Sequence, residues 1–97
     1  MWVLLAETTD LRTRTFRLTR GSSKTIGRGA EADFIVDAPL VSRLHCRLSA
    51  TGTDRLEVED LDSTNGTFVN DERVARKTLD VGDRLRVGRL ELVVTQE

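Results

Sequence analysis

The amino-acid sequence predicts an all-β protein, with its strands arranged as an antiparallel sandwich or barrel. Short apolar or alternating segments recur along the 97 residues, and turn-forming Gly, Asp, Asn or Ser bounds each of them. No segment has the spacing of a convincing helix. Residues 30–33 are helix-friendly in composition but too few to hold a helix alone, so we expect them in a loop. Many short strands at this spacing are typical of a sandwich or a barrel.

The first half of the chain is expected to supply five strands. Residues 2–6 are apolar and suit a buried strand, whereas residues 15–19 alternate between apolar and polar side chains. A turn at residues 20–23 separates the second strand from the third. The other three strands are expected at residues 24–26, 34–36 and 46–50.

The second half of the chain continues the same pattern. Residues 56–59 alternate cleanly, and the turn-forming residues 51–54 before them predict a hairpin with the strand at 46–50. Further strands are expected at residues 67–69, 85–87 and 90–94, with an apolar position at Val74 and turns at residues 65–66, 80–83 and 88–89.

The composition is that of one small globular domain covering residues 1–97. Hydrophobic residues make up 38% of the chain and charged residues 32%, and the net charge is -1. The chain lacks the basic surplus of a general nucleic-acid or membrane-surface binder, so we expect direct contact with neither. Because Cys46 is the only cysteine and no apolar run resembles a membrane span or a signal peptide, we expect an intracellular protein.

The sequence offers little for catalysis or for a cofactor. Ser42 and His45 are close enough to form a nucleophile pair, but no nucleophile elbow and no obvious orienting carboxylate accompany them. The single histidine cannot assemble a metal site with Cys46 alone. Residues 27–30 lack the glycine pattern of a dinucleotide site and of a P-loop. We expect no catalytic residue, metal or cofactor, and a hydrolase that uses Ser42 and His45 is the alternative.

Three motifs on predicted loops together carry the residue types of a phosphate site. They are Gly27-Arg28, Ser42-Arg43-Leu44-His45 and Ser63-Thr64-Asn65-Gly66. An arginine makes charge-assisted bonds to phosphate, hydroxyl groups donate to its oxygens, and Asn-Gly forms a tight turn. Each motif alone also has a structural interpretation, as an arginine at a strand end, a histidine that ties loop backbones together, or an ordinary turn. Only the combination points to a function.

The order and separation of these motifs resemble the forkhead-associated (FHA) domain family. The signature of that family is Gly-Arg, then Ser-x-x-His, then Asn-Gly, and residues 79–88 are similar to its closing segment. The resemblance covers essentially the whole chain. It implies an FHA-type β-sandwich of two twisted, mainly antiparallel sheets, with loops at one end that bind phosphothreonine-containing proteins.

The resemblance also implies a role for each motif residue. Phosphothreonine carries about -1.5 to -2 charges near neutral pH, so Arg28 would supply charge-assisted bonds and Ser42 and Thr64 hydroxyl donors. Arg43 would add donors, and Asn65 would bond the peptide backbone beside the phosphorylated residue. Structural members of the motif would be Gly27 for close approach, His45 for loop bracing and Gly66 for turn geometry. Loose candidates for contact with the third residue after the phosphothreonine are Leu40, Val41 and Arg89.

A narrower resemblance is to the N-terminal FHA domain of nibrins, on residues 1–5, 42–45 and 66–72. It implies a nuclear protein of double-strand-break repair or checkpoint signalling, joined to the Mre11–Rad50 complex through regions absent here and followed by BRCT repeats. Thr64-Asn65 follows the general FHA consensus instead, where nibrins can differ. The alternative to phosphothreonine binding is a phosphorylation-independent sandwich that binds proteins through its sheet faces.

Overall fold

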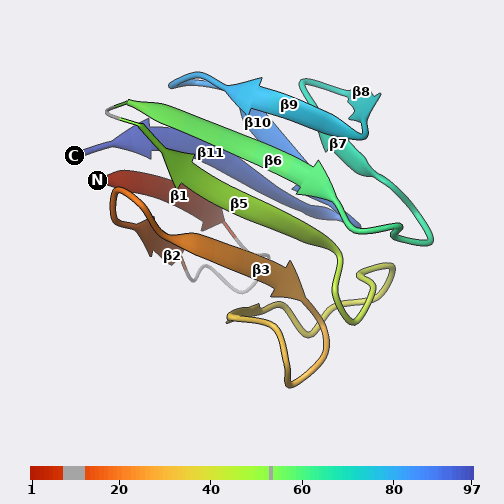
Figure 1. The fold of residues 1–97 in the computed structure, drawn as a ribbon. Coiled ribbons are helices and arrows are strands. Elements are labelled where there is room, and N and C mark those ends of the chain that lie inside the picture. Colours follow the sequence, from red (N-terminus) through yellow and green to blue (C-terminus); the bar gives the residue numbers. More distant parts are fainter. Residues whose placement is uncertain (8–12, 53) are drawn as a thin grey trace.

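The protein folds into two β-sheets that pack face to face, as a computed structural model covering residues 1–7, 13–52 and 54–97 describes (Figure 1). The six-stranded sheet contains, in spatial order, β2 (Thr13–Leu18), β1 (Trp2–Glu7), β11 (Leu90–Gln96), β10 (Arg84–Val87), β7 (Thr67–Val69) and β8 (Glu72–Val74). The five-stranded sheet contains β4 (Phe34–Ile35), β3 (Ser23–Gly27), β5 (Cys46–Thr51), β6 (Arg55–Asp60) and β9 (Arg76–Leu79). The predicted all-β sandwich is confirmed.

Strand pairing is antiparallel throughout the described residues except between β3 and β4. The two ends of the chain lie side by side, because the Met1 amino group and the Glu97 carbonyl oxygen are 3.2 Å apart and the Glu97 N–H donates to the Met1 carbonyl at 2.9 Å. The loops that leave β3, β4 and β6 lie at the opposite end of the sandwich (Figure 1). Within the described ranges, no helix has the length and apolar character needed to cross a membrane.

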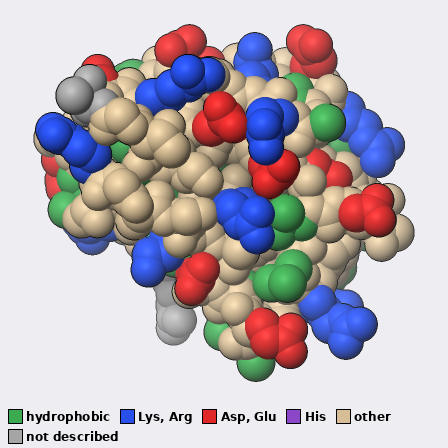
Figure 2. All heavy atoms as spheres, viewed as in Figure 1, with side chains coloured by type: hydrophobic (Ala, Val, Ile, Leu, Met, Phe, Trp, Pro, Cys, Tyr) green, Lys and Arg blue, Asp and Glu red, His purple; other side chains and the backbone are tan. Residues whose placement is uncertain are grey.

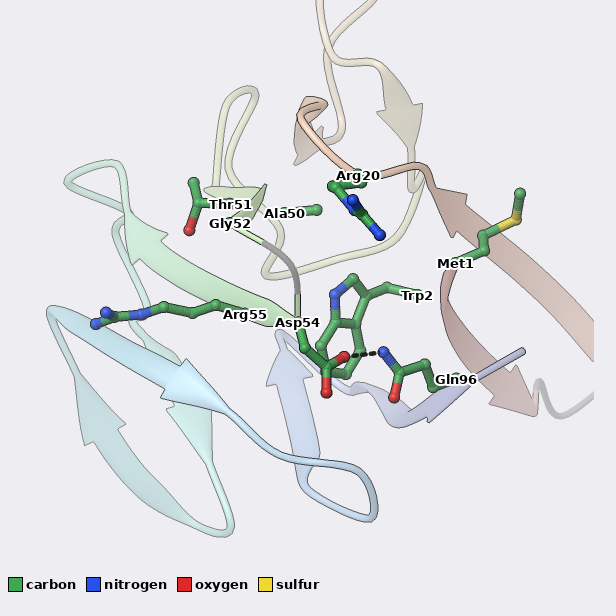
Figure 3. Close-up of a pocket in the computed structure, with 9 residues that line it drawn as sticks. All are labelled: Met1, Trp2, Arg20, Ala50, Thr51, Gly52, Asp54, Arg55 and Gln96. Carbon is green, nitrogen blue, oxygen red and sulfur yellow. Dashed lines mark hydrogen bonds between the residues drawn. The ribbon is translucent and has the colours of Figure 1, made fainter.

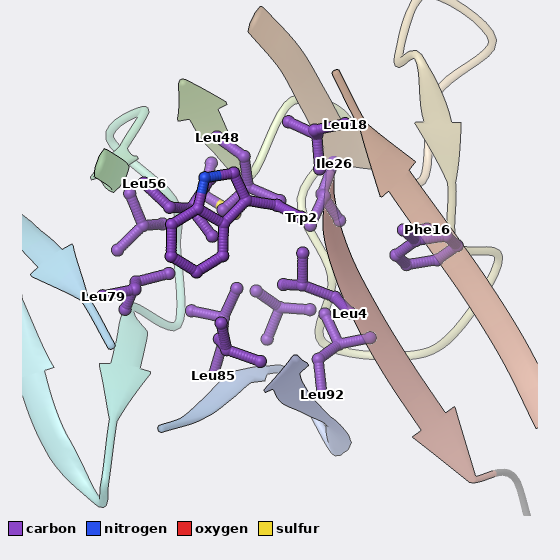
Figure 4. Packing of buried hydrophobic residues seen from close by; sticks show 14 of the residues in the cluster. Trp2, Leu4, Phe16, Leu18, Ile26, Leu48, Leu56, Leu79, Leu85 and Leu92 are labelled. Atoms are coloured by element: carbon purple, nitrogen blue, oxygen red, sulfur yellow. The ribbon is translucent and has the colours of Figure 1, made fainter. Parts of the chain in front are cut away.

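The core lies between the sheets and follows from the alternation seen in the sequence. In β5, Cys46, Leu48 and Ala50 are buried while the residues between them are exposed or half-buried. Each fully buried leucine contributes about 1.5–3 kcal/mol by leaving water. Figure 4 shows such side chains converging between the sheets; those fully buried include Leu4, Leu18, Ile26, Leu48, Leu56, Leu85 and Leu92.

The largest departure from the sequence prediction is at β8 and β9, which were not expected as separate strands. Asn70 and Asp71 both adopt positive φ, at 50° and 68°, and form the two-residue turn between β7 and β8. The chain then passes from one sheet to the other at Ala75, whose carbonyl accepts the Asp60 N–H at 2.8 Å. Neither short strand has a clear apolar alternation, because most of its side chains are exposed or half-buried.

The smaller predictions mostly agree with the structure. Residues 30–33 lie in a loop, and the strand predicted at 34–36 ends at Ile35, with Val36 buried just beyond it. The β5 and β6 strands pair in antiparallel register up to Thr51 and Arg55. Of the turn predicted between these strands, Thr53 lies outside the described residues.

Candidate functional site

The loops that leave β3 and β4 are held together by backbone hydrogen bonds. The Arg28 N–H donates to the Ser42 carbonyl at 2.9 Å, and the Gly29 N–H donates to the Arg43 carbonyl at 3.0 Å. Gly27 makes this approach possible: a Cβ added there would lie 2.0 Å from the Arg43 carbonyl oxygen, well inside contact distance. The lack of a side chain at Gly27 therefore lets the two loops approach closely.

His45 connects the β4–β5 loop (residues 36–45) to the β6–β7 loop (residues 61–66). Its side chain is fully buried, its Nδ1 accepts the Ser42 backbone N–H at 3.1 Å, and its Nε2 lies 2.8 Å from the Gly66 carbonyl oxygen. Because Nδ1 is the acceptor, Nε2 carries the proton and donates to Gly66. Both ring nitrogens are occupied by backbone groups, so the geometry favours a bracing role over a Ser42–His45 nucleophile pair.

The β6–β7 loop is organised by the carboxylate of Asp60 at the end of β6. Its Oδ1 accepts the Ser63 hydroxyl at 2.6 Å and the Thr67 hydroxyl at 2.7 Å, and its Oδ2 accepts the Ser63 N–H at 3.2 Å. Burial acts to raise the pKa of Asp60, but these hydrogen bonds outweigh it and hold the pKa below its ordinary value. The Ser63 hydroxyl oxygen in turn accepts the Gly66 N–H at 2.9 Å, where φ is 91°.

An open hollow of about 240 Å³ lies where these loops meet. Its lining residues are Arg28, Leu40, Val41, Ser42, Thr64 and Asn65. The Ser42 hydroxyl oxygen accepts the Thr64 N–H at 3.0 Å, which leaves its own proton available to a ligand. Arg28 is exposed and makes no ion pair among the described residues. One unpaired cation beside two hydroxyls suits a small anionic group.

Four of the five predicted binding residues therefore meet in one hollow, and Arg43 is the exception. Arg43 is exposed beside the hollow and does not line it; its Cβ lies 3.1 Å from where a Cβ on Gly29 would be. Leu40 and Val41, named only loosely from the sequence, are both part of the lining, whereas Arg89 is not.

Sequence reasoning missed two contributions to the site. Asp60 was not singled out, although an acid followed by hydroxyl residues three and seven positions later could have suggested the network. Leu40 adopts φ of 72°, and its carbonyl accepts the Asn65 side-chain amide at 3.1 Å. No sequence signal marks a leucine for positive φ. Asn65 therefore also joins two loops within the protein.

A larger hollow of about 560 Å³ lies on the six-stranded sheet and is lined by Leu5, Arg84, Glu91 and Val93, but its arginine already pairs with Glu91 at 2.6 Å. A smaller hollow of about 110 Å³ lies at the opposite end, beside Trp2, Arg20 and Gln96 (Figure 3). Acidic and basic side chains intermingle on the face seen in Figure 2. On the five-stranded sheet, Arg76 pairs with both Glu57 and Glu59. No cluster of metal-ligating side chains occurs in residues 1–7, 13–52 and 54–97. Burial, assisted by the charge of Asp60, raises the pKa of the Cys46 thiol to about 12.

Comparison with known proteins places this geometry in a family. Residues 24–88 match the family model of the FHA domain, and this range contains all three motifs. The FHA domain-containing protein FhaA of Mycobacterium tuberculosis is 42% identical over 81 residues, which are 84% of this chain and 15% of FhaA. An oxoglutarate dehydrogenase inhibitor of Corynebacterium jeikeium is 39% identical over 67 residues, 69% of this chain and 46% of that protein. The chain thus spans less than half of these relatives.

Solved structures agree in fold. The FHA domain of FhaA, complexed with the intracellular domain of Rv3910, superposes with a TM-score of 0.86 at 36% identity and covers 98% of this chain and 100% of that one. A structure from a study of phosphothreonine-dependent FHA domain interactions gives a TM-score of 0.83 at 35% identity and covers 99% and 96%.

The narrower resemblance to nibrins is not supported, because the relatives compared above are bacterial proteins, FhaA and an oxoglutarate dehydrogenase inhibitor. That resemblance had implied a nuclear location, a role in DNA repair, the Mre11–Rad50 complex and BRCT repeats, and these are not supported either. The structure explains why those residues misled: residues 2–5 belong to β1, which pairs with β2 and β11, and residues 67–72 lie in the β7–β8 hairpin. Both features serve the sandwich itself and specify no particular host protein.

Proposed function

This chain belongs to the FHA domain family, and from that premise we propose that it binds phosphothreonine in partner proteins through the hollow between its loops. The observation that carries the proposal is the convergence of Arg28, Ser42 and Thr64 on one open hollow, although they come from three separate loops. Support also comes from the structural relative studied for phosphothreonine-dependent interactions. The protein would act by recruitment and would catalyse no reaction.

The chemistry of the hollow suits a phosphorylated side chain. The phosphate offers three strong acceptor oxygens and about -1.5 to -2 charges at neutral pH. Arg28 would make charge-assisted hydrogen bonds to it, the Ser42 hydroxyl would donate its unused proton, and the Thr64 hydroxyl would donate from the facing loop. Arg43, which is exposed beside the hollow, would contribute at longer range.

Asn65 would hold the peptide backbone beside the phosphothreonine. One of its side-chain N–H groups donates to the Leu40 carbonyl, which leaves the amide oxygen and the second N–H for a ligand. Because Leu40 and Val41 line the same hollow, they would meet apolar groups of the peptide. Asn65 would therefore orient the peptide, whereas Arg28 would recognise the charge of the phosphate.

We further propose that the module works inside the cell in protein signalling. Phosphothreonine-containing proteins would be its partners, in the same way that the FHA domain of FhaA forms a complex with the intracellular domain of Rv3910. Direct nucleic-acid or membrane binding would play no part, since the net charge is -1 and the five-stranded sheet carries paired charges.

Calorimetric titration of three matched peptides tests the proposal, with the same threonine phosphorylated, replaced by phosphoserine, or unmodified. We expect the phosphothreonine peptide to bind most tightly and Arg28→Ala to weaken it by roughly tenfold or more, as loss of a hydrogen bond to a charged group implies. Arg20→Ala, an exposed arginine at the opposite end, is the matched control and should leave binding unchanged. Equal binding of the three peptides would favour the phosphorylation-independent alternative.

A further inference from the structure

We propose that a row of side chains on the outer face of the six-stranded sheet, Arg73, Phe68 and Arg86, docks an acidic segment of the phosphothreonine partner. This inference rests on the proposed function, because the segment must belong to a peptide held in the neighbouring hollow. The partner is thereby narrowed to phosphothreonine sequences that carry aspartate or glutamate a few residues from the phosphorylated position.

The row is built by strand register. Phe68 of β7 lies opposite Arg73 of β8 on one side and opposite Arg86 of β10 on the other. The guanidinium carbon of Arg86 stands 4.3 Å from the centre of the Phe68 ring, a cation–π arrangement that holds this long side chain in place. The flanking residues Thr67 and Val69 are buried in the core, so by alternation the row faces outward.

The row is continuous with the candidate phosphate site. A Cβ added to Gly66 would lie 2.8 Å from Nε of Arg73, so this guanidinium rests against the backbone that immediately follows Asn65. Phe68 lies two residues after Gly66 in the chain. Since an extended peptide advances about 3.3 Å per residue, acidic residues about two to five positions from the phosphothreonine would reach the row.

The charges of the row are not neutralised by the protein. Among residues 1–7, 13–52 and 54–97, neither Arg73 nor Arg86 has a carboxylate within 4.0 Å. Glu91 is the register partner of Arg86, but its carboxylate pairs with Arg84 at 2.6 Å. Two unpaired cations on either side of a half-buried aromatic ring favour an acidic peptide, by charge complementarity and by their fixed spacing.

The arrangement favours a peptide over a nucleic acid. The row contains two cations only, the chain as a whole carries a net charge of -1, and the basic residues of the five-stranded sheet face are largely paired with acids. A nucleic-acid surface needs a broader basic patch than this. A short acidic segment matches the size and the charge of the row.

The test uses fluorescence anisotropy with three phosphothreonine peptides: one with neutral flanks, one with aspartates two to five residues before the phosphothreonine, and one with aspartates two to five residues after it. We expect one acidic peptide to bind about three- to tenfold more tightly than the neutral one at low salt, since each exposed ion pair contributes modestly. The advantage should shrink as ionic strength rises.

Variants then locate the effect. Arg73→Gln and Arg86→Gln should each reduce the advantage of the acidic peptide while the neutral peptide binds as before, which excludes damage to the loop. Arg17→Gln is the matched control, because Arg17 belongs to the same sheet at its far edge and pairs with Glu97. Charge reversal, Arg73→Glu, should favour a lysine-flanked peptide instead.

The outcomes separate this inference from the proposed function. If both acidic peptides bind like the neutral one, or if the advantage survives Arg73→Gln, the inference is overturned while phosphothreonine binding stands. Loss of neutral-peptide binding in Arg73→Gln would also overturn it, because Arg73 would then act on the hollow itself. If even the neutral phosphopeptide binds no better than its unphosphorylated form, the proposed function fails.

Discussion

Replacing Asp60 with alanine should both destabilise the fold and disorganise the binding loop. The substitution removes the acceptor of the Ser63 and Thr67 hydroxyls, at 2.6 and 2.7 Å, and of the Ser63 N–H at 3.2 Å. Ser63 and Thr67 are buried, so water cannot fully replace the lost partner. A hydrogen bond to a charged group contributes about 1.5–3 kcal/mol. Taking the lower value for the two short bonds, because Asp60 is half-buried, gives a loss of about 3 kcal/mol.

Urea unfolding followed by tryptophan fluorescence measures this loss, since Trp2 lies in the core. For a domain of this size about 3 kcal/mol corresponds to roughly 12–24 °C in Tm. Asp60→Asn keeps one acceptor oxygen and should lose about half as much. A loss below about 1 kcal/mol in the alanine variant would refute the reasoning that this carboxylate organises the loop.

The contribution of Asp60 should also depend on pH. The pKa of Asp60 in the folded protein lies below its ordinary value, so between the two values the unfolded chain binds more protons than the folded one. The stabilisation is therefore fully present above about pH 4, the ordinary aspartate range, and is lost as the pH falls through the lower folded value. The stability difference between the wild type and Asp60→Asn should shrink in acid; a constant difference from pH 7 to pH 2 would contradict this assignment.

Three other predictions concern the scaffold beneath the hollow. Gly27→Ala should cost about 1–3 kcal/mol or more in urea unfolding, because the new methyl meets the Arg43 carbonyl, which is backbone and cannot move aside cheaply; unchanged stability would show that the loops separate easily. His45→Ala should lower the free energy of unfolding by about 3–5 kcal/mol, since it leaves a cavity and two unpaired backbone groups. A much smaller effect in urea unfolding would mean that water replaces the ring. Cys46 should resist thiol reagents in the folded protein, because its thiol is buried with a pKa of about 12; rapid labelling without denaturant would contradict the packing of β5.

The sequence predicted those strands along which apolar and polar side chains alternate. The strands that became β5 and β6 have regular burial on one face, and their apolar spacing predicted them. The short strands β8 and β9 have no such pattern, since their pairing depends on the positive φ of Asn70 and Asp71 and on a change of sheet at Ala75. A backbone conformation of this kind leaves little trace in hydrophobicity.

The site shows the same division. Arg28, Ser42 and Thr64 could be grouped from motif order, and the structure brings them to one hollow. The roles of Asp60 and Leu40 depend on contacts between separate loops or on an unusual φ, which composition and spacing do not encode. The residues that line the hollow were thus easier to predict than the residues that hold them in place.

The most direct test of the central claim is an NMR titration of ¹⁵N-labelled protein with a phosphothreonine peptide and with its unphosphorylated form. We expect the largest shifts in the backbone amides of residues 28, 42–43 and 64–66 and in the side-chain Nε–H of Arg28, and none of this size with the unphosphorylated peptide. Shifts confined to the sheet faces, or equal shifts with both peptides, would contradict a phosphate site formed by Arg28, Ser42 and Thr64.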